Sequence, residues 1–212
     1  MQSGHYIIIC EGASEYAYLQ QAQQLIREIP LKDYAFEPPF KLIPFRQNGA
    51  NGGHFNSLKK RFAEAKRANR NSPIHIWADF DVYHRNDSRC AQDYANKSQG
   101  IPDFHFSLHN FEDFLALHFK KELLAEWIAW GERSHFNNPL ATDDGASLIA
   151  KLMLGYQKGS LESGFVTIER LKILKENLSL QPNSNPYELN GIGKFADFLI
   201  GQLERHHPEI FR

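Results

Sequence analysis

The sequence has little cysteine, no long hydrophobic run and no excess of charge of either sign. Its two cysteines, Cys10 and Cys90, are far apart, which excludes a disulfide scaffold and a four-cysteine zinc site. The longest apolar stretch near the N-terminus, Ile7 to Cys10, is too short to cross a bilayer, and no signal-peptide pattern precedes it. We therefore expect a reduced, cytoplasmic protein with no membrane segment.

The charge balance also limits the class of partner. The 24 basic and 25 acidic residues give a net charge of -1, so the overall field favours no particular ligand. A nucleic acid would have to be held by a local basic patch, or by a metal ion that bridges the like charges. The 212 residues, 42% of them hydrophobic, are enough for one domain, or one domain with a substantial elaboration, with its own core.

Strand and helix patterns alternate in the first half of the chain. Short apolar runs predict strands at residues 6–10, 40–45, 74–78 and 104–108. Helical periodicity predicts helices at 15–29, with Ser14 as the N-cap, and at 56–69. This alternation is typical of β-α-β units in a parallel sheet with right-handed crossovers.

The second half of the chain shows only helical patterns. They cover residues 111–118, 121–130, 146–154, 166–178 and 192–205, with no convincing strand between them. We therefore expect an α/β fold, with a Toprim-like, mostly parallel sheet flanked by helices in residues 1–119. Residues 120–212 are expected to form a helical C-terminal elaboration packed on that core.

Acidic residues follow two of the predicted strands. Glu11 ends the first strand, and Asp79 and Asp81 end the third. Ligands collect at the carboxyl ends of the strands of an open parallel sheet, so these carboxylates converge if the two strands are neighbours. Like charges at close range repel unless a cation lies among them, and oxygen ligands suit Mg²⁺ or Mn²⁺. Glu15, in the first turn of the following helix, is in position to join them.

Each of these features also has a simpler interpretation. An isolated Asp-x-Asp is common, a Glu-Gly pair is a frequent turn, and Glu15 alone is a favourable first-turn carboxylate. Their joint position at strand ends favours the metal-site interpretation.

Three segments carry a resemblance to known families. Residues 8–15 (IICEGASE) and 74–81 (IHIWADFD) resemble the Toprim fold of topoisomerases, primases and OLD-type nucleases. Residues 107–119 (SLHNFEDFLALHF) are similar to the Ser-Asn-Pro-x-Phe-Glu stretch and the following apolar helix of the RloB-like family. Tyr156 and Lys158 match the Tyr-x-Lys of that family, whereas Leu108-His109 stands where the family has Asn-Pro.

The resemblance implies a Mg²⁺- or Mn²⁺-dependent nuclease that cleaves phosphodiester bonds in DNA or RNA, of a kind associated with restriction loci and phage defence. Glu11 would be the general acid/base or a metal-facing carboxylate, and Asp79 and Asp81 would hold the metal. Glu15 and Glu112 are candidates for a second ion. Lys158 is a candidate for the cation that meets transition-state charge, and a plain exposed lysine is the alternative interpretation.

A basic segment supplies candidate contacts to nucleic acid. Its six cations lie in and just after one predicted helix: Lys59, Lys60, Arg61, Lys66, Arg67 and Arg70. Each phosphate that they neutralise would add affinity through counterion release. A solvated helix face is the alternative. The ten histidines give no zinc pattern, and His118, in an apolar helix, is expected to be a satisfied buried histidine.

Three other functions stay open. The first is a non-catalytic Toprim-like module that binds nucleotide or a partner. The second is a nuclease that cuts only when assembled with a partner protein encoded nearby. The third is a haloacid-dehalogenase-like phosphatase with Asp79 as nucleophile and Asp81 as general acid/base. That motif normally follows the first strand of its core, whereas Asp79 follows the third predicted strand.

Overall fold

The computed structural model describes residues 6–28, 40–43, 55–79, 104–107, 109–134, 138–153, 155–178 and 192–212. Within these residues the strands are β1 (Tyr6–Cys10), β2 (Phe40–Ile43), β3 (Ile74–Ala78), β4 (Phe104–Phe106) and β5 (Ile192–Lys194). The helices of the core are α1 (Ala13–Glu28), α2 (Phe55–Ala68) and α9 (Phe195–His206). Four more helices follow β4: α5 (Phe111–Ala116), α6 (Lys121–Ser134), α7 (Asp143–Leu152) and α8 (Ile168–Asn177).

The described strands form one parallel sheet in the order β2-β1-β3-β4-β5. The register pairs Cys10 with Trp77, Ala78 with Phe106, and Phe106 with Lys194. The last residues of these four strands therefore lie side by side along one edge of the sheet. The prediction of an α/β fold with a parallel sheet flanked by helices is confirmed.

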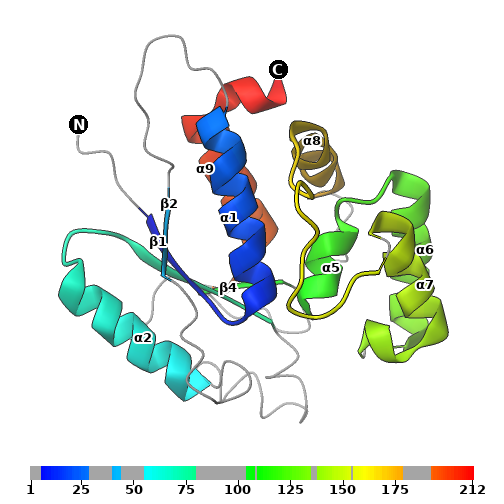
Figure 1. Ribbon diagram of the computed structural model, residues 1–212, viewed down its shortest axis with the longest axis horizontal. Coiled ribbons are helices and arrows are strands. Elements are labelled where there is room, and N and C mark those ends of the chain that lie inside the picture. The colour runs from blue at the N-terminus through cyan, green and yellow to red at the C-terminus, as the bar shows by residue number, and fades with distance from the viewer. Residues whose placement is uncertain are drawn as a thin grey trace.

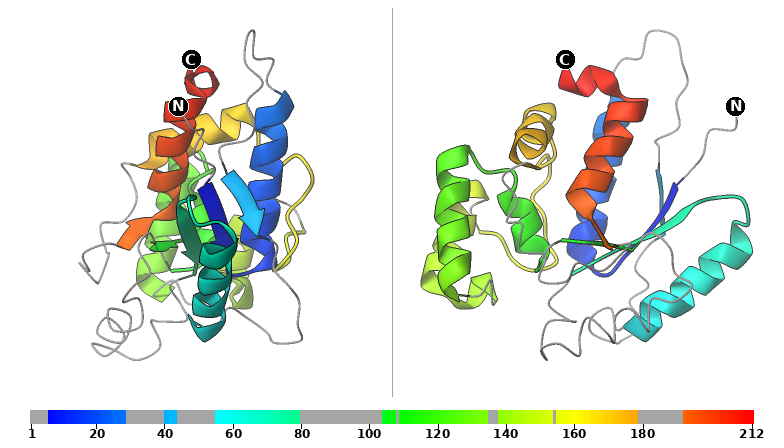
Figure 2. Two further views of the ribbon diagram at one scale, coloured as in Figure 1. Left: turned by 90° about the vertical axis from the view of Figure 1, so that its left-hand side faces the viewer. Right: turned by 180° about the vertical axis from the view of Figure 1, so that it is seen from behind.

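Helices cover both faces of the sheet. Successive side chains of a strand point to opposite faces, so the apolar residues of these strands need a covering layer on each side. Ile7, Ile9, Ile74 and Ile76 pack with the apolar side of α2. Ile8, Cys10 and Trp77 belong to a larger core on the other face, which includes residues of α1 and α9. Figure 1 and Figure 2 show α2 on one side of the sheet and α1 and α9 on the other, with α5 to α8 beyond them.

The segment from residue 192 to 205 differs from its prediction. It is not one helix: Ile192–Lys194 forms the edge strand β5, which pairs with β4 and leads directly into α9. The expectation of no strand in the second half is therefore wrong. A three-residue strand is too short to show an alternating pattern, and the helical pattern of α9 begins at the next residue.

The other predicted elements agree more closely with the structure. The predicted strands at 6–10 and 74–78 match β1 and β3 at both ends. The predicted division after residue 119 stays a prediction, although β5 and α9, which join the sheet, come from the second part of the chain. No helix in the described ranges is both long enough and apolar enough to span a membrane.

Candidate active site

Glu11 and Asp79 lie next to each other at the carboxyl edge of the sheet. Their strands, β1 and β3, are neighbours, as the predicted convergence requires. The backbone N–H of Asp79 donates a hydrogen bond to Glu11 Oε2 at 2.7 Å, and the backbone N–H of Glu11 donates to the Trp77 carbonyl at 2.9 Å. Asp81, the third predicted carboxylate, is outside the described residues.

Glu15 is buried at the start of α1, with its side chain folded back over Gly12. Its Oε2 is only 2.9 Å from the place where a Cβ on residue 12 would lie, so a side chain there would collide with it. Burial raises the pKa of Glu15 to about 7, opposed by hydrogen bonds from the backbone of Glu15 and Gly12, and the nearby Glu112 raises it further. The structure thus places Glu15 near Glu112, and their role in holding a second ion stays a prediction.

Glu112 comes from the first turn of α5 and is completely buried. Asn110 begins this helix, because its side-chain oxygen accepts a hydrogen bond from the Asp113 N–H at 3.0 Å. Glu112 Oε1 accepts a hydrogen bond from the Tyr156 hydroxyl at 3.1 Å, and its Oε2 has no hydrogen-bond partner among the described residues. Burial raises the pKa of Glu112, and the positive charge of Lys158 opposes that rise.

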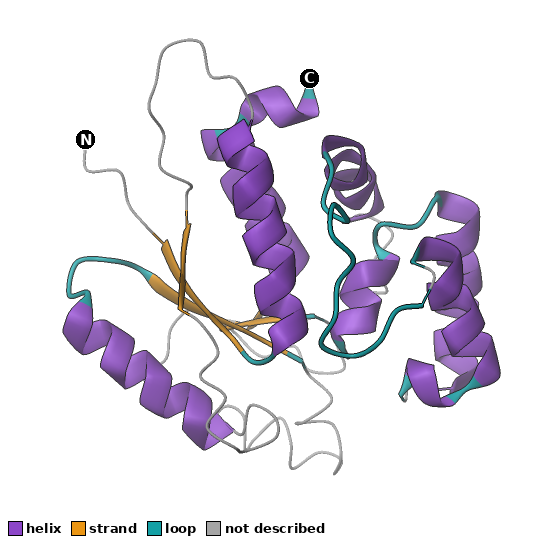
Figure 3. Cartoon of the chain, viewed as in Figure 1, coloured by secondary structure: helices purple, strands orange, loops and turns teal. Residues whose placement is uncertain are grey.

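Lys158 lies beside these carboxylates. It is exposed, in a turn of the loop between α7 and α8 that runs past the start of α1 (Figure 3). Its charge is among the influences that lower the pKa values of Glu15 and Glu112. The structure therefore brings Lys158 into the cluster, and its catalytic role stays a prediction.

The six predicted cations of the basic segment do not all lie near the carboxyl edge of the sheet. Arg61 Nη1 donates a hydrogen bond to the Cys10 carbonyl at 3.4 Å, beside Glu11. Because α2 connects the carboxyl end of β2 to the start of the parallel strand β3, it runs away from the carboxyl edge. Lys66, Arg67 and Arg70 therefore lie toward the opposite edge. Lys59 and Lys60 are exposed near the first turn of α2.

The atoms at this edge that could ligate a metal are all carboxylate oxygens, which suit a hard cation. One of them, Glu112 Oε2, is buried without a hydrogen-bond partner in the described part of the chain. Among the described residues, no three His, Cys, Asp or Glu side chains are grouped closely enough to hold a metal ion. Asp81, which the metal-site prediction requires, is outside the described residues.

Comparison of the chain with family models, curated proteins and solved structures found no match.

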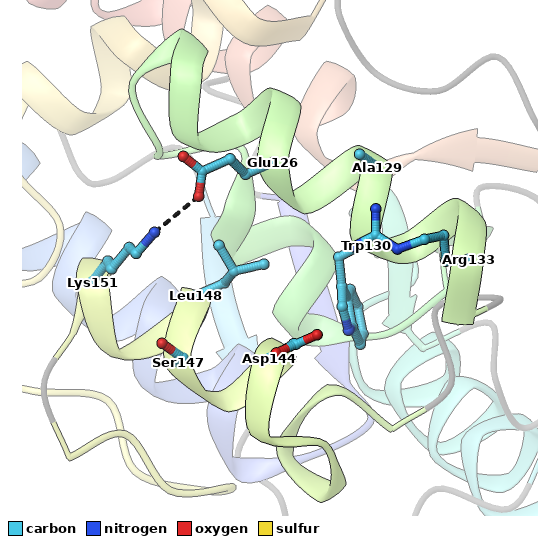
Figure 4. Close-up of a pocket in the computed structure, with 8 residues that line it drawn as sticks. All are labelled: Glu126, Ala129, Trp130, Arg133, Asp144, Ser147, Leu148 and Lys151. Carbon is cyan, nitrogen blue, oxygen red and sulfur yellow. Dashed lines mark hydrogen bonds and ion pairs between the residues drawn. The ribbon is translucent and has the colours of Figure 1, made fainter.

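A concave region lies between α6 and α7. It is a hollow of about 350 Å³, and Figure 4 shows the side chains around it. Its lining residues are Glu126, Ala129, Trp130, Arg133, Asp144, Ser147, Leu148 and Lys151. Lys151 donates to Glu126 across its rim at 2.8 Å. None of the predicted site residues that the structure describes lines it.

The histidine prediction is confirmed at His118. Its Nε2 is 2.9 Å from the Tyr18 hydroxyl and its Nδ1 is 3.2 Å from the Leu115 carbonyl, so both ring nitrogens have partners in the core. Burial lowers its pKa to about 3, which keeps the ring neutral.

Two polar residues at the site have roles that the sequence does not reveal. Ser14 is expected to cap α1, but α1 begins at Ala13 and the Ser14 hydroxyl accepts a hydrogen bond from the Gly159 N–H at 2.9 Å. Tyr156 reaches Glu112, as described above. The Tyr-x-Lys match marks Tyr156 as a residue of interest, but it does not say which carboxylate the hydroxyl contacts.

Proposed function

We propose that this protein is a divalent-metal-dependent nuclease with a Toprim-like core, which hydrolyses phosphodiester bonds in DNA or RNA. The observation that carries the proposal is the gathering of acidic side chains from three segments at one edge of a parallel sheet. Glu11 and Asp79 are joined by a hydrogen bond, and Glu15 lies beside Glu112 in a buried setting. Burying like charges together is unfavourable, and a cation among them would offset that cost.

The residues have separate tasks in this proposal. Glu11 and Asp79, together with Asp81, would hold the metal, and Glu15 and Glu112 are in position for a second ion. The metal would supply polarisation of a phosphoryl oxygen and activation of a water molecule. Lys158 and Arg61 would bind phosphate oxygens on either side of the carboxylates, and Lys59 and Lys60 would contact the neighbouring nucleic-acid backbone.

A cellular role in phage defence is part of the same proposal. It is supported by the RloB-like features at residues 107–119 and at Tyr156 and Lys158. The Asn110 N-cap and the buried Glu112 give this segment a local geometry that presents a carboxylate to the site.

The proposal predicts that the melting temperature rises with Mg²⁺ or Mn²⁺ and that Asp79 is needed for that rise. A ligand at 100 times its dissociation constant stabilises the folded state by about 2.7 kcal/mol, which is several degrees for a chain of this size. Asp79→Asn keeps the side-chain shape and removes its charge. We expect this variant to lose both the metal-dependent rise and the metal-dependent cleavage of mixed-sequence DNA or RNA oligonucleotides.

Asp144→Asn is the matched control, because Asp144 lies in the hollow between α6 and α7. It should behave like the wild type in both measurements. Glu112→Gln provides a second test if Asp79→Asn does not fold. Metal-dependent cleavage that survives both Asp79→Asn and Glu112→Gln would contradict the proposal, and so would a wild type that neither binds metal nor cleaves.

A further inference from the structure

The turn that carries Lys158 is attached to the first turn of α1. Gly159 has a φ of +84°, a conformation that glycine adopts without strain, and this directs its N–H to Ser14 Oγ at 2.9 Å. An isolated antiparallel β-bridge between Gln157 and Ser160 closes the turn on itself. Ser14, at the start of α1, is therefore one anchor of this turn.

Tyr156 provides the second anchor and extends the contact to Glu112. The Tyr156 hydroxyl donates to Glu112 Oε1 at 3.1 Å, and the Ser14 side chain is near enough to lower the pKa of this hydroxyl. Burial and Glu112 raise the pKa of Tyr156, whereas Ser14 lowers it. Gly159 thus donates to Ser14 and Tyr156 donates to Glu112, while Ser14 and Tyr156 lie near each other between these two bonds. We call these four residues the hydrogen-bond chain.

Lys158 lies within the turn that this hydrogen-bond chain fixes. Its side chain is exposed and makes no hydrogen bond or ion pair to another described residue, yet its charge acts on both Glu15 and Glu112. A lysine ammonium is a point charge on a flexible stem, so the position of its backbone decides where that charge is concentrated. The backbone on both sides of Lys158 is held by Tyr156 and Gly159.

We propose that Ser14 and Tyr156 are positioning residues, which hold the Lys158 ammonium at the carboxylates so that it meets the charge developing on a phosphodiester during cleavage. This inference rests on the function proposed above. The hydrogen-bond chain transfers no atoms; it fixes geometry. A displacement of about 1 Å at a reacting centre can lower a rate roughly a hundredfold, so the loss of one hydroxyl is expected to be measurable.

The first test is a double-mutant cycle on the full chain, with dual-labelled mixed-sequence DNA and RNA oligonucleotides as probes and Mn²⁺ as the metal. Tyr156→Phe should lower kcat by roughly tenfold to a hundredfold with a smaller change in KM. In the Lys158→Ala background the same substitution should cause little further loss, because its effect acts through Lys158. Ser160→Ala is the matched control in the same turn and should leave kcat unchanged. Losses that multiply in the double variant would overturn the inference.

The second test measures the hydrogen-bond chain without any activity. The Gly159 amide should exchange slowly with solvent in the wild type, faster in Ser14→Ala and Tyr156→Phe, and slowly again in Ser14→Thr, which restores a hydroxyl. If the wild type is active but the Gly159 amide exchanges at the same rate in these variants as in the wild type, the positioning role alone is overturned. A wild type that cleaves neither probe overturns the proposed function, and the role in cleavage with it, even where Gly159 exchange follows the expected pattern.

Discussion

Glu15 and His118 are two buried titratable side chains that respond to pH in opposite directions. Burial disfavours the charged form of each, so it raises the pKa of Glu15 to about 7 and lowers the pKa of His118 to about 3. A carboxyl group with a raised pKa favours the folded state at low pH, whereas a histidine with a lowered pKa favours it at high pH. The two residues can therefore be separated by the pH at which each variant is compared with the wild type.

We predict that His118 lowers the stability of the protein in acid. Below about pH 6.5 the unfolded chain binds a proton on this histidine and the folded chain does not, so the free energy of unfolding falls by about 1.4 kcal/mol for each pH unit down toward pH 3. His118→Gln removes this titration, and urea unfolding followed by circular dichroism at pH 7, 6 and 5 should show a shallower fall. An unchanged slope in the variant would contradict the prediction.

We predict the opposite pH dependence for Glu15, measured in EDTA. Because its folded pKa is raised to about 7, the folded chain holds an extra proton between about pH 4.5 and 7, and stability is lost as the pH rises through that range. Glu15→Gln should therefore be more stable than the wild type at pH 8, by roughly 1–3 kcal/mol, and differ little from it at pH 4.5. If Glu15→Gln were less stable than the wild type at pH 8, the Glu15 charge would stabilise the folded state and the prediction would be wrong.

The individual site residues differ in how far the sequence predicts them. Glu11 and Asp79 could be placed together, because both end apolar strands and parallel strands present their carboxyl ends at one edge. The contact between Ser14 and Gly159 could not be predicted, because it joins residues 145 positions apart through a loop with no periodic pattern. Long-range side-chain contacts of this kind follow from packing, which single-sequence patterns do not contain.

At the scale of elements, the fully buried strands were the best predicted. β1 and β3 are short, mostly apolar runs, with His75 as the exception in β3, that end at polar residues, and their bounds follow from that pattern. β5 was missed because its three residues, which include Gly193, have almost no pattern of their own. Its strand conformation comes from pairing with β4 at the edge of the sheet.

We predict that Gly145→Ala destabilises the protein, although alanine is normally the better helix former. Gly145 lies in the first turn of α7, where the Thr142 hydroxyl accepts a hydrogen bond from its N–H. A Cβ at residue 145 would lie 2.5 Å from the Pro139 carbonyl and 2.9 Å from the Trp130 ring, so the packing of α7 on α6 would have to shift. Overpacking of this kind costs about 1–3 kcal/mol in the free energy of unfolding.

Gly201→Ala is the matched control for this prediction. Gly201 lies in α9, and a Cβ there would meet no atom within 4 Å. This substitution should stabilise the protein by about 0.5–1 kcal/mol, the ordinary gain in helix propensity. If both substitutions changed stability by the same amount in urea unfolding, the close approach at Gly145 would have no energetic consequence.

On the scale of the whole molecule, the sheet joins both halves of the chain. Trp77 in β3 stacks on Phe195 of α9 with ring centroids 3.7 Å apart, so an early strand and a late helix share one core. The same core includes Leu124 and Trp127 of α6. The hydrophobic patterns predicted an α/β protein with additional helices, but they could not predict that the last helix returns to cover the sheet.

All three tryptophans are buried, one in β3 and two in α6. Trp77 lies beside the carboxyl edge, where its carbonyl accepts from the Glu11 N–H and its indole N–H donates to Ser107 Oγ at 2.7 Å. Trp127 and Trp130 form a pair in α6 with ring centroids 4.8 Å apart, close enough to exchange excitation energy. Emission from Trp77 thus reports on the sheet edge, while the coupled pair reports on the packing of α6 against α7.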